Sequence, residues 1–294
     1  MLNSKNQKRK LRIKSLLKKK VKNNLKILFY VLMALTLIFK IIILITEEKN
    51  LYQPDKEVDL TPQNISLAYE DLFFPTEDKQ SLNGWFIPAE NAKITVLFCS
   101  GRGGNLSDRL QKIKFFHEMG LNTFVFDYRG FGNSSGKPSE QGLYKDARGA
   151  YDYLITRNDI DKNKIVVYGK SLGGPVAADL CLHRKAAALI LEGAFPSLKT
   201  YVGDVGGFLP TEWLVSDKFD TISKVANIRI PKLIVHGMDD EIINFSEGRM
   251  IFYKAAMPKE FVSFDGHHDD NLYTVSEEFK NRILKFFIAY KMSV

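Results

Sequence analysis

From residue 94 onward, short apolar runs alternate with longer stretches in which apolar residues recur every three to four positions. The short runs predict strands over residues 94–100, 122–128, 164–171, 187–195, 231–237 and 260–266. The first of them, 94–100, is continuously apolar, as expected of a strand buried on both faces. The intervening stretches predict helices over residues 106–120, 139–156, 172–185, 245–257 and 275–292. Two earlier strands, over 65–74 and 82–90, are expected to form a hairpin.

This alternation of strands and helices is typical of an α/β fold, in which a mostly parallel central sheet carries helices on both faces. We expect one such domain over residues 65–294. The stretch between the strand at 187–195 and the strand at 231–237 is irregular. Within it, Pro196 to Lys224 is the only candidate for a lid, and this lid is short.

The N-terminal part of the chain carries a different pattern, a run of 20 residues from Ile27 to Thr46 with a single charge at Lys40. About 20 apolar residues span the hydrocarbon core of a bilayer. A lysine at the centre costs roughly 2.5–3.5 kcal/mol, which the many Leu, Ile and Phe residues offset. A cleaved signal peptide would have a shorter apolar region and a small-residue cleavage site, and LITEEKN offers none. The run therefore predicts an uncleaved transmembrane helix.

Charge is divided unevenly between the two parts. The net charge is +8, but residues 1–46 hold 12 of the 42 basic residues and no acidic one. The remainder carries 30 basic against 34 acidic residues. A mildly acidic body argues against a nucleic-acid partner. The positive-inside rule predicts that residues 1–26 form a basic cytoplasmic arm, that 27–46 span the membrane, and that the domain follows a linker (47–64) on the non-cytoplasmic side.

The two cysteines, Cys99 and Cys181, lie in apolar runs, and we expect free thiols there.

The stretch VVYGKSLGG, from Val166 to Gly174, allows two interpretations. A phosphate-binding loop, G-x-x-x-x-G-K-[ST], would require glycine at position 164, where the chain has Lys164. The nucleophile elbow G-x-S-x-G fits, with Ser171 at its centre between a predicted strand and a predicted helix. The motif alone arises easily by chance, and its position between these two elements makes it specific.

A serine hydroxyl needs a base and an acid to become a nucleophile, in the chain order Ser, Asp, His for this elbow. Asp239 and Asp240 follow the strand at 231–237, and His267 and His268 follow the next strand. Polar loop residues and a surface histidine are the ordinary interpretation of each pair alone. Their order after consecutive strands, at the carboxyl ends where α/β sheets place their sites, indicates a catalytic triad.

The oxyanion hole requires two backbone amides. The amide of Leu172 follows the nucleophile, and the amide of Arg102, in the turn SGRGGN, is the expected second donor. A glycine-rich turn that merely enters a helix is an equally good interpretation of that segment alone.

From about Ile65 to the C-terminus, the chain resembles the α/β-hydrolases, and among them the membrane-anchored, serine aminopeptidase-like branch. The resemblance is carried by DYRGFGNSSGKPSEQGLYKDA, GKSLGG, FDTISKVANIRIPKLIVHGMDDEI and DGHHDD. It implies that the pattern H-G-x-x-D assigns the triad acid to Asp240 and that G-x-H-[ND]-D assigns the base to His268. It also implies structural roles for Asp127 and Arg129. The oxyanion turn departs from the family, because it begins with Ser100 in place of histidine and has Arg102 where a small residue is usual.

These observations predict a membrane-anchored serine hydrolase with the catalytic residues Ser171, Asp240 and His268 and the oxyanion donors Leu172 and Arg102. The mechanism requires no metal and no organic cofactor. The expected substrate is a small-molecule or lipid-linked acyl ester or thioester, and Phe195, Tyr201, Phe208, Leu209 and Trp213 are candidates to line an acyl channel. The alternatives are a peptidase of the aminopeptidase type and a non-catalytic membrane protein with the same fold.

Overall fold

The structure is a computed structural model that describes residues 18–19, 22–38, 51–201, 218–269 and 276–292. The chain divides into two compact units, Met1–Glu47 and Glu48–Val294. In the first unit, residues 22–38 are helical. Among the described residues, no helix has the length and apolarity needed to cross a bilayer. The predicted span, 27–46, continues past these residues, since 39–46 lie outside the described part.

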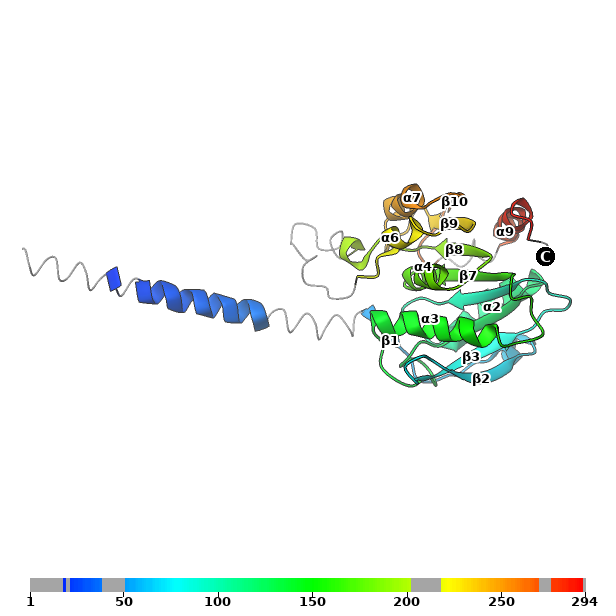
Figure 1. Cartoon of the computed structure of the whole chain (residues 1–294), viewed down its shortest axis with the longest axis horizontal. Helices are drawn as coiled ribbons and strands as arrows, with labels where there is room; N and C mark the ends of the chain where they lie inside the picture. Colours follow the sequence, from blue (N-terminus) through cyan, green and yellow to red (C-terminus); the bar gives the residue numbers. More distant parts are fainter. Residues whose placement is uncertain (1–17, 20–21, 39–50, 202–217, 270–275, 293–294) are drawn as a thin grey trace, which may run out of the picture. The chain divides into compact units, whose positions relative to one another are not determined.

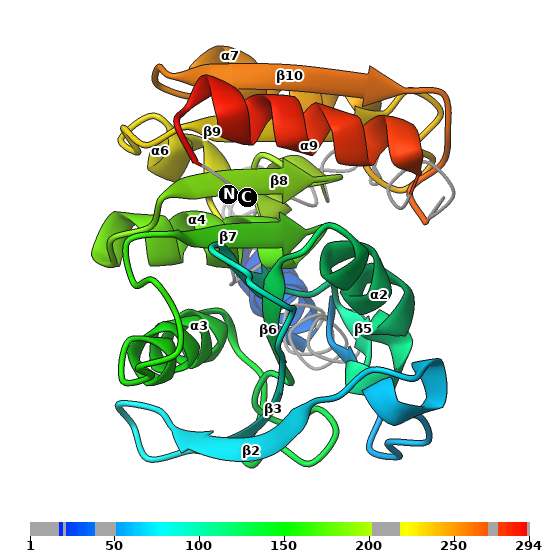
Figure 2. The same cartoon turned by 90° about the vertical axis from the view of Figure 1, so that its right-hand side faces the viewer.

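One sheet organises the second unit (Figure 1). Within the described residues its strand order is β10-β9-β8-β7-β4-β6-β3-β2, as Figure 2 shows from β10 at the top to β2 at the bottom. The strands are β2 (Glu70–Pro75), β3 (Ser81–Ile87), β4 (Thr95–Cys99), β6 (Asn122–Phe126), β7 (Ile165–Lys170), β8 (Ala188–Glu192), β9 (Lys232–Gly237) and β10 (Lys259–Phe264). Strand β3 is antiparallel to β2 and to β6, and the other neighbours are parallel. The expected mostly parallel sheet is confirmed.

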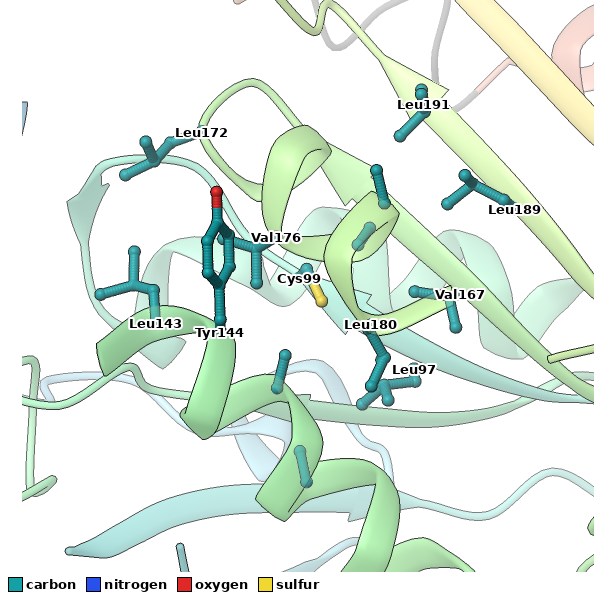
Figure 3. Packing of buried hydrophobic residues seen from close by; sticks show 14 of the residues in the cluster. Leu97, Cys99, Leu143, Tyr144, Val167, Leu172, Val176, Leu180, Leu189 and Leu191 are labelled. Atoms are coloured by element: carbon teal, nitrogen blue, oxygen red, sulfur yellow. The ribbon is translucent and has the colours of Figure 1, made fainter. Parts of the chain in front are cut away.

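Helices cover both faces of this sheet. They are η2 (Leu106–Arg109), α2 (Leu110–Glu118), α3 (Glu140–Leu154), α4 (Gly173–His183), α6 (Thr221–Val225), α7 (Phe245–Lys254) and α9 (Glu277–Ala289). Alternate residues of each buried strand enter different cores, so that Leu97 packs with the core of α3, α4 and α7, whereas Val96 packs with that of α2 and α9. Figure 3 shows the first of these cores, where Leu97, Cys99 and Val167 of the sheet lie near Val176 and Leu180 of α4. Burial on both faces explains the continuous apolar runs of the sequence.

The cysteines are free, as expected, with Cys99 buried and Cys181 partly exposed.

The chain before the sheet differs from its prediction. The strand expected over 65–74 begins only at Glu70, because Pro62–Ile65 form a 3-10 helix (η1). Part of the segment predicted as a linker packs on the body, with the side chains of Leu51 and Tyr52 buried in the core. Two short strands that the sequence did not indicate follow, β1 (Gln53–Pro54) and β5 (Gly103–Gly104), which pair in parallel.

Candidate active site

Ser171 lies on a sharp turn between β7 and α4, with a positive φ of 52°. This left-handed conformation is unusual for a residue other than glycine and is a feature of nucleophile elbows. The turn requires glycine two residues later, since a Cβ on Gly173 would lie 2.0 Å from the carbonyl oxygen of Cys99. The amide of Ser171 donates to the carbonyl of Glu192 (2.9 Å) and so ties the turn to the end of β8.

The Glu192 side chain is itself held in place beneath this turn. Lys112 of α2 donates to its carboxylate at 2.8 Å, and both side chains are almost fully buried. Burial acts to raise the pKa of Glu192, but the nearby ammonium groups of Lys112 and Lys170 outweigh it and hold the pKa below its ordinary value. The ion pair between Lys112 and Glu192 stabilises the end of β8, and the backbone of Glu192 there accepts the hydrogen bond from Ser171.

His268 connects the serine to an acid. Its Nε2 lies 3.1 Å from Ser171 Oγ, and its Nδ1 lies 2.8 Å from Asp240 Oδ2. A carboxylate accepts hydrogen bonds, so Nδ1 carries the proton and the Nε2 lone pair faces the serine hydroxyl. The three residues follow β7, β9 and β10, and they form the arrangement that activates a serine nucleophile.

Asp240 has four donors around its buried carboxylate. The amides of Ile242 and Ile243 donate to Oδ1 at 3.0 and 2.7 Å, and buried His236 Nε2 lies 3.3 Å from Oδ2, which also accepts from His268. Burial acts to raise the pKa of Asp240, but the hydrogen bonds from His236 and His268 outweigh it and lower the pKa below its usual range. Asp240 is therefore an ionised acceptor for His268.

His236 is a residue of the site that sequence reasoning missed. Its ring is fully buried, and its Nε2 also lies 2.8 Å from the carbonyl oxygen of Ile243. Since a carbonyl only accepts, Nε2 carries the proton. His236 is the histidine of the pattern H-G-x-x-D, but the pattern was used only to identify Asp240 as the acid and did not indicate that the His236 ring contacts it.

The second member of each doublet lies outside this arrangement. Asp239 and His267 are exposed, and His267 Nδ1 faces Glu241 Oε2 at 3.0 Å. That carboxylate, through its hydrogen bond to the ring, raises the pKa of His267. The structure thus brings together Ser171, His268 and Asp240, while the catalytic role of each stays a prediction.

The two amides predicted to form the oxyanion hole also lie beside Ser171. Leu172 precedes α4, and the turn that carries Arg102 is so close that a Cβ on Gly101 would be 3.7 Å from Ser171 Cβ. Within the described part of the chain, neither the amide of Leu172 nor that of Arg102 donates to another backbone group. Both are available to an oxygen bound at Ser171.

The turn that carries Arg102 is held by the strap formed by residues 51–57. The amide of Gln53 donates to the carbonyl of Arg102 at 3.0 Å, and the amide of Asp55 donates to that of Gly104 at 3.2 Å. Farther along, Asn105 donates through its side chain to the carbonyl of Glu57. The strap replaces solvent on one side of this turn and fixes its backbone.

Two cavities meet at Ser171. The larger, of about 320 Å³, is mostly polar and is lined by Gln53, Gly101, Arg102, Gly103, Gly104, Asp108, Arg109, Lys170, Ser171, Ile242, His268 and Asp269. The smaller, of about 20 Å³, is mostly apolar and is lined by Leu51, Arg102, Ser171, Leu172, Phe195, Leu198, Tyr201, Ile242 and Ile243. Phe195 and Tyr201, two of the predicted channel residues, thus lie beside the nucleophile. The other three, and most of the predicted lid, fall within 202–217, outside the described residues.

The loop after β6 is held by the residues for which the resemblance implied structural roles. Arg129 is largely buried and pairs with Asp146 (2.8 Å) and Asp78 (2.9 Å). Asp127 is buried, its amide donates to the carbonyl of Asn83, and its own carbonyl accepts from Ser134 Oγ. Neither side chain belongs to the residues around Ser171.

Comparisons with known proteins agree with this geometry. The family model described as "Serine aminopeptidase, S33" matches residues 90–223. The alpha/beta hydrolase domain-containing protein WAV2 of Arabidopsis thaliana is 34% identical over 271 residues, which cover 83% of this chain and 88% of the relative. Alpha/beta hydrolase domain-containing protein 17B of Xenopus tropicalis is 37% identical over 198 residues, covering 62% and 63%.

Among solved structures, an esterase from Pyrococcus furiosus superposes with a TM-score of 0.68 at 22% identity, covering 81% of this chain and 98% of its own. This likeness concerns the fold alone. Together with the relatives of 30% identity and more, it shows that the chain belongs to the α/β-hydrolase family.

Proposed function

We propose that this protein is a membrane-anchored serine hydrolase that cleaves carboxylic esters or thioesters through an acyl-enzyme. The observation that carries the proposal is the hydrogen-bonded series from Ser171 Oγ through the His268 ring to Asp240. Such a series converts a poor nucleophile into an effective one. A non-catalytic protein with this fold would have no need to keep the series, the strained elbow and two unoccupied amides in one place.

The reaction follows from these positions. Ser171 Oγ attacks the acyl carbon while His268 Nε2 takes its proton, and Asp240 stabilises the imidazolium that results. The amides of Leu172 and Arg102 bind the oxyanion. The bond from carbon to the leaving oxygen or sulfur then breaks, and His268 returns its proton to that atom. Water, activated by the same ring, attacks the acyl-enzyme and releases the acid with Ser171 regenerated.

The surroundings of Ser171 favour an acyl substrate over a peptide. The apolar cavity between Leu51, Phe195 and Tyr201 accepts a hydrocarbon group next to the nucleophile. Its small volume suits the first carbons of a short to medium chain. We infer an esterase or thioesterase, and a peptidase of the aminopeptidase type is the second candidate because of the family model that matches residues 90–223.

Anchoring is proposed from the apolar run at 27–46 and the basic residues before it. Because the body already begins at Leu51, only four residues would separate it from such an anchor, and four residues span at most about 14 Å. A site so tethered would meet lipids and lipidated molecules in preference to dilute soluble ones.

The activity is tested with residues 48–294, the second compact unit. We expect faster turnover of nitrophenyl butyrate or an acyl thioester than of any aminoacyl nitroanilide. Efficient release from the nitroanilide with little or no esterase activity would establish the peptidase in its place.

Topology is tested separately in the full chain. A cysteine at the extreme N-terminus should react with a membrane-impermeant thiol reagent only after the membrane is opened, whereas a cysteine replacing the exposed Glu57 should react from outside. The reverse pattern would place the catalytic domain in the cytoplasm.

A further inference from the structure

The polar cavity beside Ser171 carries positive charge that the proposed mechanism does not use. Its lining includes the cations Arg102, Arg109 and Lys170 and the anions Asp108 and Asp269. We propose that this cavity binds the leaving group of the substrate and selects a leaving group that carries a carboxylate or a phosphate. The inference rests on the proposed function and deepens it by naming the substrate class.

The position of His268 indicates which cavity holds the acyl chain and which holds the leaving group. The leaving group must depart beside the ring that protonates it. Among the described residues, His268 lines the polar cavity but is not part of the lining of the apolar one. The acyl chain therefore occupies the apolar side, next to Leu172 and Phe195, and the alcohol or thiol part occupies the polar side.

Some of the charges in the polar cavity are compensated within the protein. Lys170 Nζ lies 3.7 Å from Asp269 Oδ1 and 3.7 Å from Glu192 Oε1. Asp108 Oδ2 accepts from the amide of Asn105 at 2.8 Å. These groups have internal partners and do not require a ligand.

Two guanidinium groups remain, and of these Arg109 lies near the carboxylates of Asp108 and Asp127, whereas Arg102 has no such neighbour among the described residues. The half-buried Arg102 side chain makes no hydrogen bond or ion pair with any residue that the structure describes, although it lines both cavities. Arg109 donates through Nη2 to the carbonyl of Gly103, but its Nε is buried and has no partner among the described residues. Both groups face a cavity that ends at the nucleophile.

An anionic oxygen group matches these donors. A carboxylate or a phosphate supplies a pair of oxygen acceptors that a guanidinium group binds in a bidentate arrangement. The preferred substrate is thus an acyl ester or thioester of an anionic alcohol or thiol, of which the acyl part is apolar.

The test uses the full chain in detergent and three thioesters with the same butyryl group. Their thiols are 3-mercaptopropionamide, which is neutral, and 3-mercaptopropionate and 2-mercaptoethyl phosphate, which are anionic. The released thiol is quantified with a chromogenic thiol reagent. In each case Ser171 Oγ forms a bond to the acyl carbon, the carbon–sulfur bond breaks, and sulfur takes the proton from His268. We expect kcat/KM for at least one anionic thioester to exceed that for the amide by about tenfold or more, the effect of one hydrogen bond to a charged group.

Substitutions then locate the preference. In Arg102→Gln and Arg109→Gln, the ratio of anionic to neutral kcat/KM should fall toward one, and a general loss of activity cancels in this ratio. Arg282→Gln, on the exposed face of α9, is the matched control and should keep the ratio of the wild type. Raising the ionic strength should lower the wild-type ratio, a readout that does not depend on how either variant folds.

The outcomes separate the two proposals. Equal hydrolysis of the neutral and both anionic thioesters would overturn the anionic leaving group and leave the thioesterase standing, as would a preference that neither variant reduces. Hydrolysis of none of the three, with no esterase activity, would overturn the proposed function and this inference with it. The ratio between the two anions identifies which oxygen group the cavity favours.

Discussion

The amide of Gln53 donates a hydrogen bond of 3.0 Å to the carbonyl oxygen of Arg102, the residue whose own amide is the predicted second oxyanion donor. A segment near the start of the second unit is therefore joined to the backbone of the turn beside Ser171. Leu51, two residues earlier, lines the apolar cavity at Ser171. The strap of residues 51–57 contributes to the site in two ways. Gln53 positions the turn that carries the Arg102 amide, and Leu51 forms part of the lining of the apolar cavity.

Substitution of Gln53 by proline tests this relationship. Proline has no N–H and cannot make the hydrogen bond to Arg102, whereas alanine can. Because both variants lose the same side chain, Gln53→Ala is the matched control. We expect kcat toward a small thioester to be lower in Gln53→Pro by about tenfold, given the sensitivity of catalysis to one misplaced oxyanion donor. Equal kcat in the two variants would show that the strap does not position the turn.

The doublets offer a paired comparison between catalytic and neighbouring residues. His268→Ala and Asp240→Asn should each lower kcat by about 10⁴-fold or more, as expected for members of a triad. His267→Ala and Asp239→Asn should retain most of the activity, since both side chains are exposed and neither is hydrogen-bonded to Ser171 or His268. Steady-state kinetics with nitrophenyl butyrate decides. Inactivity of His267→Ala in place of His268→Ala would contradict the assignment.

His236 is expected to act as a positioning residue for Asp240. Its Nε2 lies 3.3 Å from Asp240 Oδ2, and its hydrogen bond is the first of those that lower the pKa of that carboxylate against the effect of burial. In His236→Phe, the carboxylate of Asp240 loses this donor, and its pKa should rise.

We expect kcat of this variant to be about tenfold below wild type near pH 8, because the Asp240 carboxylate loses one of the donors that hold it toward His268. His183→Gln, half-exposed at the end of α4, is the control and should keep the kcat of the wild type. A kcat equal to that of the wild type would show that His236 does not position Asp240.

Asp127 predicts how stability depends on pH. Burial, opposed by Arg109, raises its pKa from 3.8 to about 7. The folded state therefore keeps a proton that the unfolded chain releases between about pH 4 and pH 7, and the contribution of this group to stability falls as the pH rises through that window. Asparagine at this position carries no charge at any pH, so the Asp127→Asn variant does not lose stability in this way.

Urea unfolding of residues 48–294 at about pH 4 and pH 7.5 measures the effect. Relative to wild type, Asp127→Asn should gain up to a few kcal/mol between the two pH values, since each pKa unit corresponds to about 1.4 kcal/mol. A difference between the two proteins that is the same at both pH values would contradict the raised pKa.

The strands, and the grouping of Ser171, Asp240 and His268, were predictable because each left a local signal. Strands buried on both faces are continuously apolar, and β4, β7 and β8 were found on that ground. Ser171 and Asp240 each follow such a strand and His268 follows the edge strand β10, so their order along the chain indicated that they meet. The choice of Asp240 over Asp239, and of His268 over His267, came from the family resemblance, since adjacent residues in a loop differ little in any local pattern.

Features that depend on tertiary contacts left no such signal. The pair of β1 and β5 is two residues long, and Gln53–Pro54 has neither apolar character nor β-branched residues to indicate a strand. His236 lies within a predicted strand, and only the folded chain shows that its ring contacts Asp240. Arg109 stood in a predicted helix as one charge among several, and the cavity that it lines is formed by segments far apart in the sequence.

The central claim is that Ser171 is a nucleophile activated by His268, and covalent labelling with a fluorophosphonate measures this directly. The wild-type protein should form a stable adduct that mass spectrometry places on Ser171 Oγ. Ser171→Ala should remain unlabelled, and His268→Ala should label more slowly by several orders of magnitude because the hydroxyl loses its base. Equal labelling of the wild type and Ser171→Ala, or an adduct on another residue, would contradict the account.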